Sequence, residues 1–408
     1  MKRHYQKLLA QRLADFPCVA LLGVRQCGKT TLLETLGEGW QRFDLERGSD
    51  YDLIARDPDL FLRLQPEHIA IDEAQLLPSL FPALRVAIDA NRNKPGRFVI
   101  TGSSSPELVT AISESLAGRV AIIEMAPFSF SETQSLETSP FFNAFDSGFS
   151  NMASMIGQLQ PRTTPAEVTT YWMKGGYPEP WIKNRNPFIK AWMDNYVQTY
   201  VNRDIARLFP GLNRDRFRQF IQMLGGLSGT ILNYSDIART LGVSQPTVRD
   251  YLQIAHQSFI WRTLPAYAIN PHKRLVKHPK GFLRDTGLLH HFLRIPDVNA
   301  LLSHPSMGRS WEGMVIEEIL RNLNSRGIAH QAYHYRTAAG GEVDLVLEGT
   351  FGLIPIEIKH TQTVRYPELQ PLVHFIADHK CPFGLIINND IRAQPYTETI
   401  YGIPFASI

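Results

Sequence analysis

A glycine-containing stretch near the N-terminus carries residues that could bind phosphate. Residues 23–30 read Gly-Val-Arg-Gln-Cys-Gly-Lys-Thr, the spacing GxxxxGK[ST], and follow the apolar run from Val19 to Leu22. A buried strand, a glycine-bearing loop and a helix beginning at Lys29 would present successive backbone N–H groups to phosphate. Lys29 would then reach the β- and γ-phosphates, and Thr30 would place its hydroxyl on Mg²⁺. The candidate nucleotide-binding residues of this loop are Gly23, Arg25, Gln26, Cys27, Gly28, Lys29, Thr30 and Thr31.

A pair of acidic residues follows a second apolar run. His68 to Ile71 ends in Asp72 and Glu73. A carboxylate at the tip of a neighbouring strand would hold Mg²⁺, and the next one could orient or deprotonate the attacking water. Taken alone, the pair would only be acids placed favourably at a helix N-terminus. Behind a phosphate loop, the pattern favours Asp72 as a metal ligand and Glu73 as the catalytic base.

A third strand is expected from Arg97 onward, and it ends in a run of serines. Ser103 could contact the γ-phosphate or the attacking water, whereas Ser105 would cap the following helix. Short apolar runs and amphipathic helices alternate from Val19 to Met125, which predicts a doubly wound parallel α/β sheet. The stretch from Thr133 to Thr164 is polar without a clear period, and we expect a long, mobile connection or insertion there.

Composition limits the class of protein. The 408 residues suggest two or three domains at about 150 residues each, and 44% hydrophobic residues suffice for sizeable cores. The net charge of +3 means that nucleic-acid binding must be argued from local patches. No apolar run approaches the roughly 18 residues of a membrane span, so no membrane is expected. The three cysteines form no pair or metal spacing, which favours a cytoplasmic protein.

Several motifs together resemble the prokaryotic AAA-type (AAA+) ATPases, in the branch that carries a C-terminal domain of unknown function. They are the phosphate loop, Ile71-Asp-Glu-Ala-Gln, Thr101-Gly-Ser-Ser-Ser, Ser115-Leu-Ala-Gly-Arg-Val, Gly175-Gly-Tyr-Pro-Glu, Tyr200-Val-Asn-Arg-Asp and Asp285-Thr-Gly-Leu. The resemblance covers nearly the whole chain. It implies ATP and Mg²⁺ as ligands, Ser103 as a sensor, Arg119 as an arginine finger and Pro178 against the base. A finger acting on a neighbour would imply a homo-oligomer, or another protein partner.

The middle of the chain predicts a helix-turn-helix from Tyr234 to Leu252. Gln245, Thr247 and Arg249 would lie on the exposed side of its second helix, where base-reading residues sit. A hairpin wing would follow, with a basic edge in the run from His272 to Lys280 that suits DNA phosphates. The alternative, a winged helix that only packs against the nucleotide domain, stays open.

Four residues near the C-terminus could form a second catalytic site. Glu312 lies on a predicted helix, and Asp344, Glu357 and Lys359 lie on adjacent predicted strands. They resemble the PD-(D/E)XK nuclease constellation, in which carboxylates hold Mg²⁺ and the lysine steadies a nucleophilic water. Nuclease-like domains also persist as inactive binding modules, and the sequence leaves both roles open.

The sequence thus predicts three domains: an AAA-type ATPase domain at 1–165, a helical and winged-helix domain at 166–300 and a PD-(D/E)XK nuclease-like α/β domain at 301–408. The expected activity is Mg²⁺-dependent ATP hydrolysis coupled to DNA binding or processing. The alternative is a nucleotide-dependent switch that regulates partner proteins, with an inactive nuclease-like domain as an interaction module.

Overall fold

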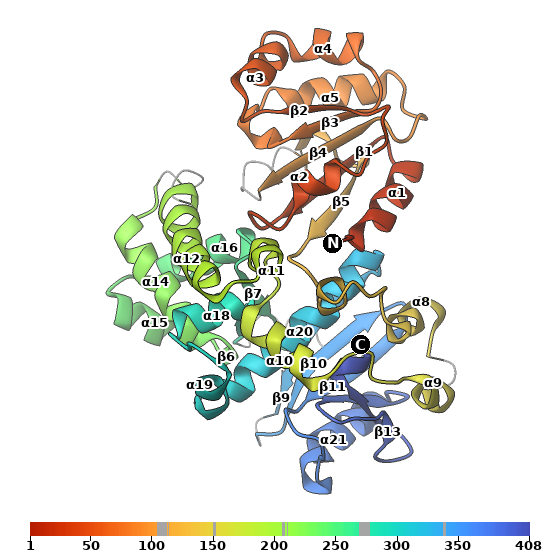
Figure 1. Ribbon diagram of the computed structural model, residues 1–408, viewed down its shortest axis with the longest axis vertical. Coiled ribbons are helices and arrows are strands. Elements are labelled where there is room, and N and C mark those ends of the chain that lie inside the picture. The colour runs from red at the N-terminus through yellow and green to blue at the C-terminus, as the bar shows by residue number, and fades with distance from the viewer. Residues whose placement is uncertain are drawn as a thin grey trace.

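The computed structural model describes residues 1–103, 112, 114–149, 152–205, 209, 211–268, 278–337 and 340–408. The N-terminal part lies at one end of the long axis, the middle part lies to one side, and the C-terminal part lies at the other end (Figure 1). The long helix α20 (Met307–Arg326) runs through the region where the parts meet (Figure 1).

The N-terminal part is built on a five-stranded parallel sheet with the order β2-β3-β4-β1-β5. This confirms the predicted parallel sheet. Its strands are β1 (Cys18–Gly23), β2 (Gln41–Asp44), β3 (Ile69–Asp72), β4 (Phe98–Ser103) and β5 (Val120–Met125). The interior strand β1, between β4 and β5, is buried along its whole length, as an apolar strand covered on both faces should be. Gly23 at its end is level with Ser103 of β4 and Met125 of β5.

Helix α1 (Tyr5–Asp15) precedes β1. The helices between the strands include α2 (Lys29–Leu33), α3 (Gly48–Ala55), α4 (Pro58–Leu64) and α5 (Leu80–Asp89). The spacing of apolar residues predicts an amphipathic helix from Leu76 to Ala90, whereas α5 begins at Leu80. Leu77 precedes Pro78, and the helical conformation is disfavoured for a residue before a proline. The backbone of Leu77 is accordingly non-helical.

The segment after β5 is packed rather than loosely connected. It contains α7 (Phe130–Thr133), a 3₁₀ turn (Pro140–Asn143), α8 (Ala144–Ser147) and α9 (Met152–Gln158). Phe141, Phe142 and Phe145 are buried in a cluster shared with the C-terminal part, and Phe145 meets Phe351 edge to face. Figure 1 shows α8 and α9 beside the C-terminal sheet. The expected loose connection is therefore wrong for these residues, whose helices are too short to produce a visible period.

The middle part is mostly helical. Its helices are α10 (Pro165–Lys174), α11 (Pro178–Lys183), α12 (Asn186–Tyr196), a π-helix (Val197–Asp204), α14 (Arg214–Leu227), α15 (Tyr234–Leu241), α16 (Gln245–Gln257), α18 (Thr286–Phe292) and α19 (Val298–Ser303). A small antiparallel sheet has the order β6-β8-β7. Its strands are β6 (Thr230–Ile231), β7 (Trp261–Leu264) and β8 (Lys280–Leu283).

The predicted helix-turn-helix corresponds to α15 and α16. Gly242 between them has a φ of 64°, the left-handed conformation that glycine adopts at little cost. Ser244 caps α16 by accepting a hydrogen bond from the Thr247 N–H. Val248 and Leu252 are buried on the inner face, as the spacing predicted.

The C-terminal part contains a six-stranded mixed sheet with the order β13-β14-β12-β11-β10-β9. Its strands are β9 (His330–Arg336), β10 (Glu342–Gly349), β11 (Gly352–Ile358), β12 (Gly384–Asn388), β13 (Gln394–Pro395) and β14 (Ile400–Pro404). Helix α21 (Gln370–His379) packs against β10 and β11. The sequence did not predict β13 and β14.

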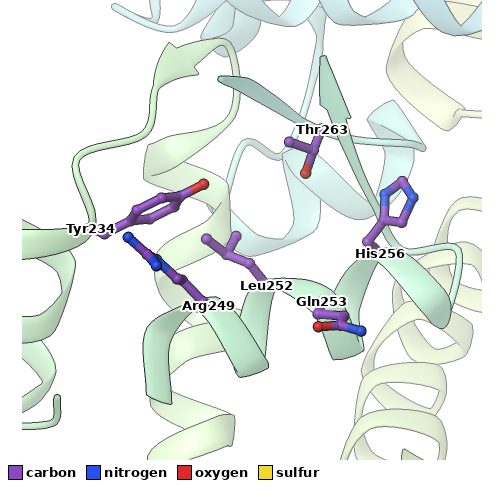
Figure 2. A pocket seen from close by; sticks show the side chains of 6 residues that line it. All are labelled: Tyr234, Arg249, Leu252, Gln253, His256 and Thr263. Carbon is purple, nitrogen blue, oxygen red and sulfur yellow. The ribbon is translucent and has the colours of Figure 1, made fainter. Parts of the chain in front are cut away.

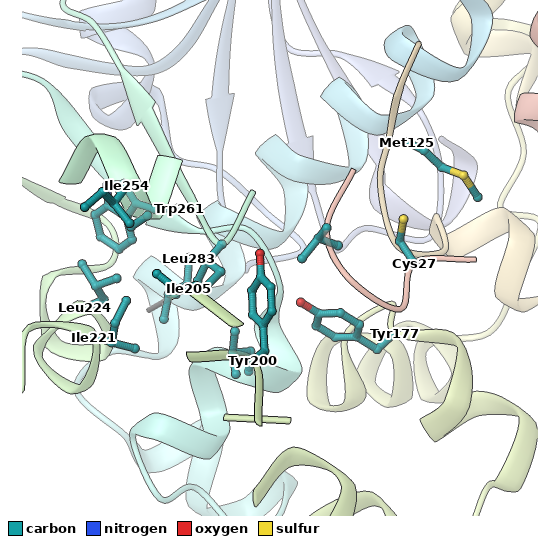
Figure 3. Packing of buried hydrophobic residues seen from close by; sticks show 14 of the residues in the cluster. Cys27, Met125, Tyr177, Tyr200, Ile205, Ile221, Leu224, Ile254, Trp261 and Leu283 are labelled. Carbon is teal, nitrogen blue, oxygen red and sulfur yellow. The ribbon is translucent and has the colours of Figure 1, made fainter. Parts of the chain in front are cut away.

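One hydrophobic core joins the phosphate loop to the middle part. Val24 and Cys27 belong to the same buried cluster as Tyr177, Tyr200 and Trp261. Figure 3 shows Cys27 beside Tyr177, with the core continuing toward Trp261. The nucleotide loop is therefore supported by side chains from a distant part of the sequence.

Candidate functional site

Two glycines shape the phosphate loop. A Cβ at Gly23 would lie 2.2 Å from the Met125 carbonyl oxygen, so only glycine fits there. Gly28 has a φ of 99° immediately before α2, a backbone conformation that side chains disfavour. Thr31 lies in the first turn of the helix, which begins at Lys29. The predicted strand, loop and helix are thus present in the predicted order.

Lys29, Thr30 and Asp72 form the centre of the site. The Lys29 side chain is buried, and its Nζ donates to the carbonyl oxygens of Gly23 at 3.1 Å and Val24 at 3.2 Å. Thr30 Oγ1 donates to Asp72 Oδ2 at 2.6 Å. Thr101 Oγ1 donates to the other oxygen of Asp72. The structure therefore brings together the lysine, the hydroxyl and the carboxylate that the sequence singled out.

Thr101 is a part of this site that the sequence reasoning missed. It lies two residues before Ser103 on β4, so strand alternation places both on the same side, which was the available signal. Ser103 ends β4 level with Gly23, and its side chain lies outside the described residues.

Glu73 lies at the edge of the site in a left-handed backbone conformation, with a φ of 55°. Its N–H donates to Asp72 Oδ1 at 3.2 Å, and its carboxylate accepts a hydrogen bond from Gln75 Nε2. Partial burial and the nearby carboxylate of Glu73 raise the pKa of Glu46, which shows that Glu46 also lies near this edge. A strained acidic residue beside a metal-binding candidate is a common property of catalytic sites.

Arg3 holds the phosphate loop from behind. Its buried guanidinium donates to the Cys27 carbonyl oxygen at 2.5 Å and to the Ala126 carbonyl oxygen at 2.7 Å, and its Nε pairs with Glu132 at 3.0 Å. The charge of Arg3 is thus satisfied while its donors fix the loop backbone. Nothing in the spacing of the sequence predicted these contacts, because Ala126 and Glu132 are more than a hundred residues from Arg3 and Cys27 is 24 residues away.

The Gly-Gly-Tyr-Pro segment lies against the loop. Tyr177 donates to Tyr196 Oη at 2.9 Å, and Tyr196 in turn donates to the carbonyl oxygen of Arg25 at 3.4 Å. Pro178 is buried at the first turn of α11. Pro178, which was predicted to contact the base, therefore directly follows Tyr177, whose side chain packs in the same hydrophobic core as the phosphate loop.

A buried network of charged groups, centred on Arg321 of α20, connects this segment to the rest of the molecule. Arg321 donates to the carbonyl oxygen of Phe128 at 3.2 Å and to Tyr171 Oη at 2.8 Å, and it lies 3.9 Å from Asp285. Asp285 accepts a hydrogen bond from the Gly176 N–H at 2.7 Å.

The same network reaches the nucleotide sheet. Arg284 pairs with Glu124 of β5 at 2.6 Å and with Glu317 of α20 at 3.3 Å, and Glu317 also pairs with Arg262 of β7. Burial would raise the pKa of Glu317, but Arg262 and Arg284 lower it to about 2. The parts of the chain are therefore joined by buried ion pairs as well as by apolar packing.

Arg119 lies away from the loop's lysine and acids. It makes a two-pronged contact with Asp89, at 2.7 and 2.8 Å, near the end of α5. An arginine acting on the nucleotide of a neighbouring chain need not contact its own loop, so the predicted finger role stays a prediction.

The candidate base-reading residues lie on the outer face of α16. Gln245 donates to Ser235 Oγ at 2.9 Å, and Thr247 contacts Ser244. Arg249 lies over the ring of Tyr234, 5.4 Å from its centre. Figure 2 shows this pair at one side of a pocket of about 290 Å³, which His256 and Thr263 also line. In the predicted basic edge, residues 272–277 lie outside the described residues.

The four C-terminal candidates also converge. Lys359 Nζ pairs with Glu357 at 2.6 Å, and the N–H of Ile358 donates to Asp344 at 2.9 Å. Asp344 and burial raise the pKa of Glu312 well above its ordinary value, with burial as the larger cause. Lys280 of β8 also lies among them and donates to Glu312 at 2.5 Å. The prediction that Lys280 belongs to a basic edge facing DNA phosphates is therefore wrong, because its side chain is buried against carboxylates.

The two sites differ in how they could hold a metal. Among the described residues, no three His, Cys, Asp or Glu side chains are arranged to hold an ion. Mg²⁺ in nucleotide sites is usually held by one or two protein oxygens together with the phosphates. Thr30 and Asp72 fit this arrangement, whereas the C-terminal carboxylates already face a lysine. In the described part of the chain, no helix is long and apolar enough to cross a membrane.

Comparison with known proteins divides the chain into three matched regions. Residues 15–134 match a family model described as an AAA domain. Residues 166–299 match a domain of unknown function, DUF8612, and residues 307–408 match another, DUF4143. The chain is 35% identical over 357 residues to Uncharacterized protein Rv2008c of Mycobacterium tuberculosis and to Uncharacterized protein Mb2031c of Mycobacterium bovis. These alignments cover 87% of this chain and 73% of each relative.

Two solved structures are more distantly similar. The Walker-type ATPase PABY2304 of Pyrococcus abyssi has 16% identity and a TM-score of 0.39, covering 72% of this chain and 95% of that chain. AMPPCP-bound DnaA from Aquifex aeolicus has 12% identity and a TM-score of 0.24, covering 62% and 86%.

Proposed function

Because this protein belongs to the family that includes the mycobacterial proteins Rv2008c and Mb2031c and contains an AAA domain, we propose that it binds and hydrolyses ATP with Mg²⁺. The observation that carries the proposal is Asp72, held between the hydroxyls of Thr30 and Thr101 beside the buried Lys29. Thr30 and Asp72 would hold Mg²⁺, which bridges the phosphates and neutralises developing charge. Lys29 would hold the β- and γ-phosphates, and Glu73 would orient or deprotonate water.

The direct test is Mg²⁺-dependent ATP turnover by the purified full chain. Lys29→Ala should abolish ATP binding and turnover, whereas Lys94→Ala, which removes an exposed lysine paired with Glu67, should change neither. A chain that neither binds nor hydrolyses ATP, or a Lys29→Ala variant that remains active, would exclude the proposal.

The nucleotide state would reach the rest of the molecule through packed contacts. Arg25 in the loop contacts Tyr196, which bonds to Tyr177, and the neighbouring Gly176 bonds to Asp285. This continuous path supports coupling between the nucleotide site and the middle part. Tyr196→Phe removes the bond to the loop while keeping the ring. We expect it to weaken any effect of a middle-part ligand on ATP turnover.

DNA is the first candidate for that ligand. The exposed face of α16, with Gln245 and Arg249, supports this assignment, since second helices of such motifs enter the major groove. Duplex DNA should then stimulate ATP turnover, and Arg249→Ala should weaken DNA binding while Arg63→Ala on α4 should not. Tight, slowly exchanging nucleotide without any response to DNA would instead favour a switch that regulates partner proteins.

An oligomer is expected if Arg119 acts in trans. Mixing inactive Arg119→Ala with inactive Lys29→Ala protein should then restore some hydrolysis, because each chain supplies what the other lacks. Such arginines contribute about 10³–10⁵ to turnover. A fully active chain that stays monomeric with ATP bound would exclude this role.

For the C-terminal part, the contacts of Lys280 favour the interaction-module alternative over DNA cleavage. A metal-dependent nuclease needs carboxylates that are open to Mg²⁺, and here the carboxylates accept hydrogen bonds from an ammonium group. We therefore derive no cleavage step. Plasmid and branched DNA should remain uncut by the full chain in Mg²⁺ or Mn²⁺, and cleavage lost in Asp344→Ala would contradict this assignment.

A further inference from the structure

Lys280, the last residue of the predicted basic edge, is a buried lysine. Only 6% of its side chain is exposed. Its Nζ donates to Glu312 at 2.5 Å and to Glu342 at 2.9 Å, and it lies 3.8 Å from Asp344. Glu312, Glu342, Asp344 and Glu357 are called the acidic cluster below.

Lys280 and the acidic cluster come from different parts of the molecule. Lys280 begins β8 and pairs in register with Ile231 and Leu264 in the small middle sheet. Glu312 lies on α20, and Asp344 lies on β10 of the C-terminal sheet. The side chain of Lys280 therefore extends from the small middle sheet into a site formed by α20 and the C-terminal sheet.

Besides Lys359, which pairs with Glu357 at 2.6 Å, the acidic cluster faces Lys280. Burial would lower the pKa of its ammonium group, but Glu312, Asp344 and Glu342 raise it above the ordinary value, so Lys280 stays charged. Burial, followed by the nearby Asp344, raises the pKa of Glu357 to about 8, which leaves this carboxyl group largely protonated at neutral pH. Among the described residues, Glu357 Oε2 has no hydrogen-bond partner.

The geometry also opposes binding of a divalent metal ion beside Lys280. Converging carboxylates repel unless a positive charge lies between them. Mg²⁺ would need oxygen ligands at about 2.0–2.1 Å in octahedral order. An ammonium nitrogen 2.5 Å from Glu312 and 2.9 Å from Glu342 already uses the oxygens that such an ion would contact.

We propose that Lys280 is the resident cation of the acidic cluster: it takes the place of a divalent metal and joins the middle part to the C-terminal part through a buried, metal-free ion-paired contact. The carboxylates surround the ammonium group of Lys280 instead of a metal ion. This inference does not depend on ATP hydrolysis.

The test measures Mn²⁺ binding by electron paramagnetic resonance on the full chain without nucleotide. All variants also carry Asp72→Asn, so that the candidate metal ligand of the phosphate loop contributes nothing. With Lys280 present we expect no Mn²⁺ signal that depends on Asp344. Lys280→Met should gain one bound Mn²⁺ per chain, and adding Asp344→Asn should remove it.

Two further variants separate charge from shape. Lys280→Arg keeps the positive charge and should still exclude Mn²⁺, and Lys94→Met on the surface should behave like the chain with Lys280. Lys280→Met should also melt at a lower temperature, with Mn²⁺ restoring part of the loss. If Lys280→Met is folded and gains no Mn²⁺, the proposal is wrong.

The chain that retains Lys280 provides a test even if Lys280→Met does not fold. Asp344-dependent Mn²⁺ binding by that chain would overturn the proposal, because the lysine and the metal ion would then share the site. Absence of such binding, together with lost folding in Lys280→Met and retained folding in Lys280→Arg, would support a resident cation.

Discussion

The phosphate-loop site and the acidic cluster both contain lysines and acidic residues, but these residues interact differently in the two sites. In the loop, Lys29 donates to main-chain carbonyl oxygens, and Asp72 accepts hydrogen bonds from the hydroxyls of two threonines. In the acidic cluster, the lysines donate directly to carboxylates, as Lys280 does to Glu312. One site keeps its charges apart, and the other pairs them.

This difference determines which site can exchange ligands. A hydrogen bond between neutral partners, or to one charged partner, contributes about 0.5–3 kcal/mol and can be replaced by contacts to a ligand. Breaking a buried ion pair by removing one partner costs about 3–5 kcal/mol. The loop is therefore suited to binding and releasing an ion with its nucleotide, whereas the acidic cluster is suited to a permanent contact. Four predictions test this contrast.

The largest effect should come from Glu73. Glu73→Gln should preserve ATP binding and reduce turnover by about 10²–10⁴, the usual contribution of a positioned base. Single-turnover hydrolysis and nucleotide binding would be measured on the same protein, with Glu38→Gln on the exposed surface as the control. Near-normal turnover by Glu73→Gln would remove Glu73 from the catalytic role.

The buried network should be the next most sensitive region. Arg321→Met leaves Asp285 without its buried charge partner, and we expect a loss of about 3–5 kcal/mol in unfolding free energy. Arg326→Met, on the same helix but paired with Asp146 near the surface, should lose far less in chemical denaturation. Equal losses would mean that burial does not distinguish the two arginines.

The acidic cluster should produce a pH dependence. The pKa of Glu357 is about 8 in the folded chain and near 4.5 when unfolded, so the folded state binds more protons between these values. Unfolding free energy should therefore fall as the pH rises from about 4.5 to 8, by about 1.4 kcal/mol for each unit of pKa difference.

Replacing Glu357 isolates its contribution to that dependence. Glu357→Gln cannot titrate, so the fall in unfolding free energy over this pH range should be smaller than in the original chain. Denaturant titrations at several pH values would measure both slopes. Identical slopes would show that the Glu357 carboxyl group titrates alike in the folded and unfolded chains.

The smallest effect should come from the exposed pair of Arg119 and Asp89. Asp89→Asn should leave the melting temperature unchanged within error, because solvent screens exposed ion pairs. It should also leave ATP turnover intact, since it frees Arg119 without removing it. A marked loss of turnover would indicate that the pair positions Arg119 for catalysis.

The sequence predicted the local features of both sites but not their surroundings. The spacing from Gly23 to Thr30 identifies a loop because its residues are contiguous, and Asp344, Glu357 and Lys359 were predicted on adjacent strands. The contacts of Arg3 and Lys280 were not predicted, because the tertiary fold alone brings their partners close. Each is a basic residue in a basic stretch of sequence, and this pattern is the same for residues on the protein surface.

The same reason explains the misjudged segment after β5. Its short helices leave no period in the sequence, and the burial of Phe141 and Phe142 depends on a C-terminal part that follows much later in the chain. Local patterns report local structure, and here the segment's structure depends on distant residues.

The burial of that segment has a consequence for synthesis on the ribosome. Phe145 emerges roughly 200 residues before its partner Phe351, an interval of about 10–40 s at about 5–20 residues per second. Until then the apolar surface that the C-terminal part contributes to this cluster is missing. A newly made chain would expose an aggregation-prone hydrophobic segment during this interval. Chaperones that bind such segments would then determine the yield of folded protein.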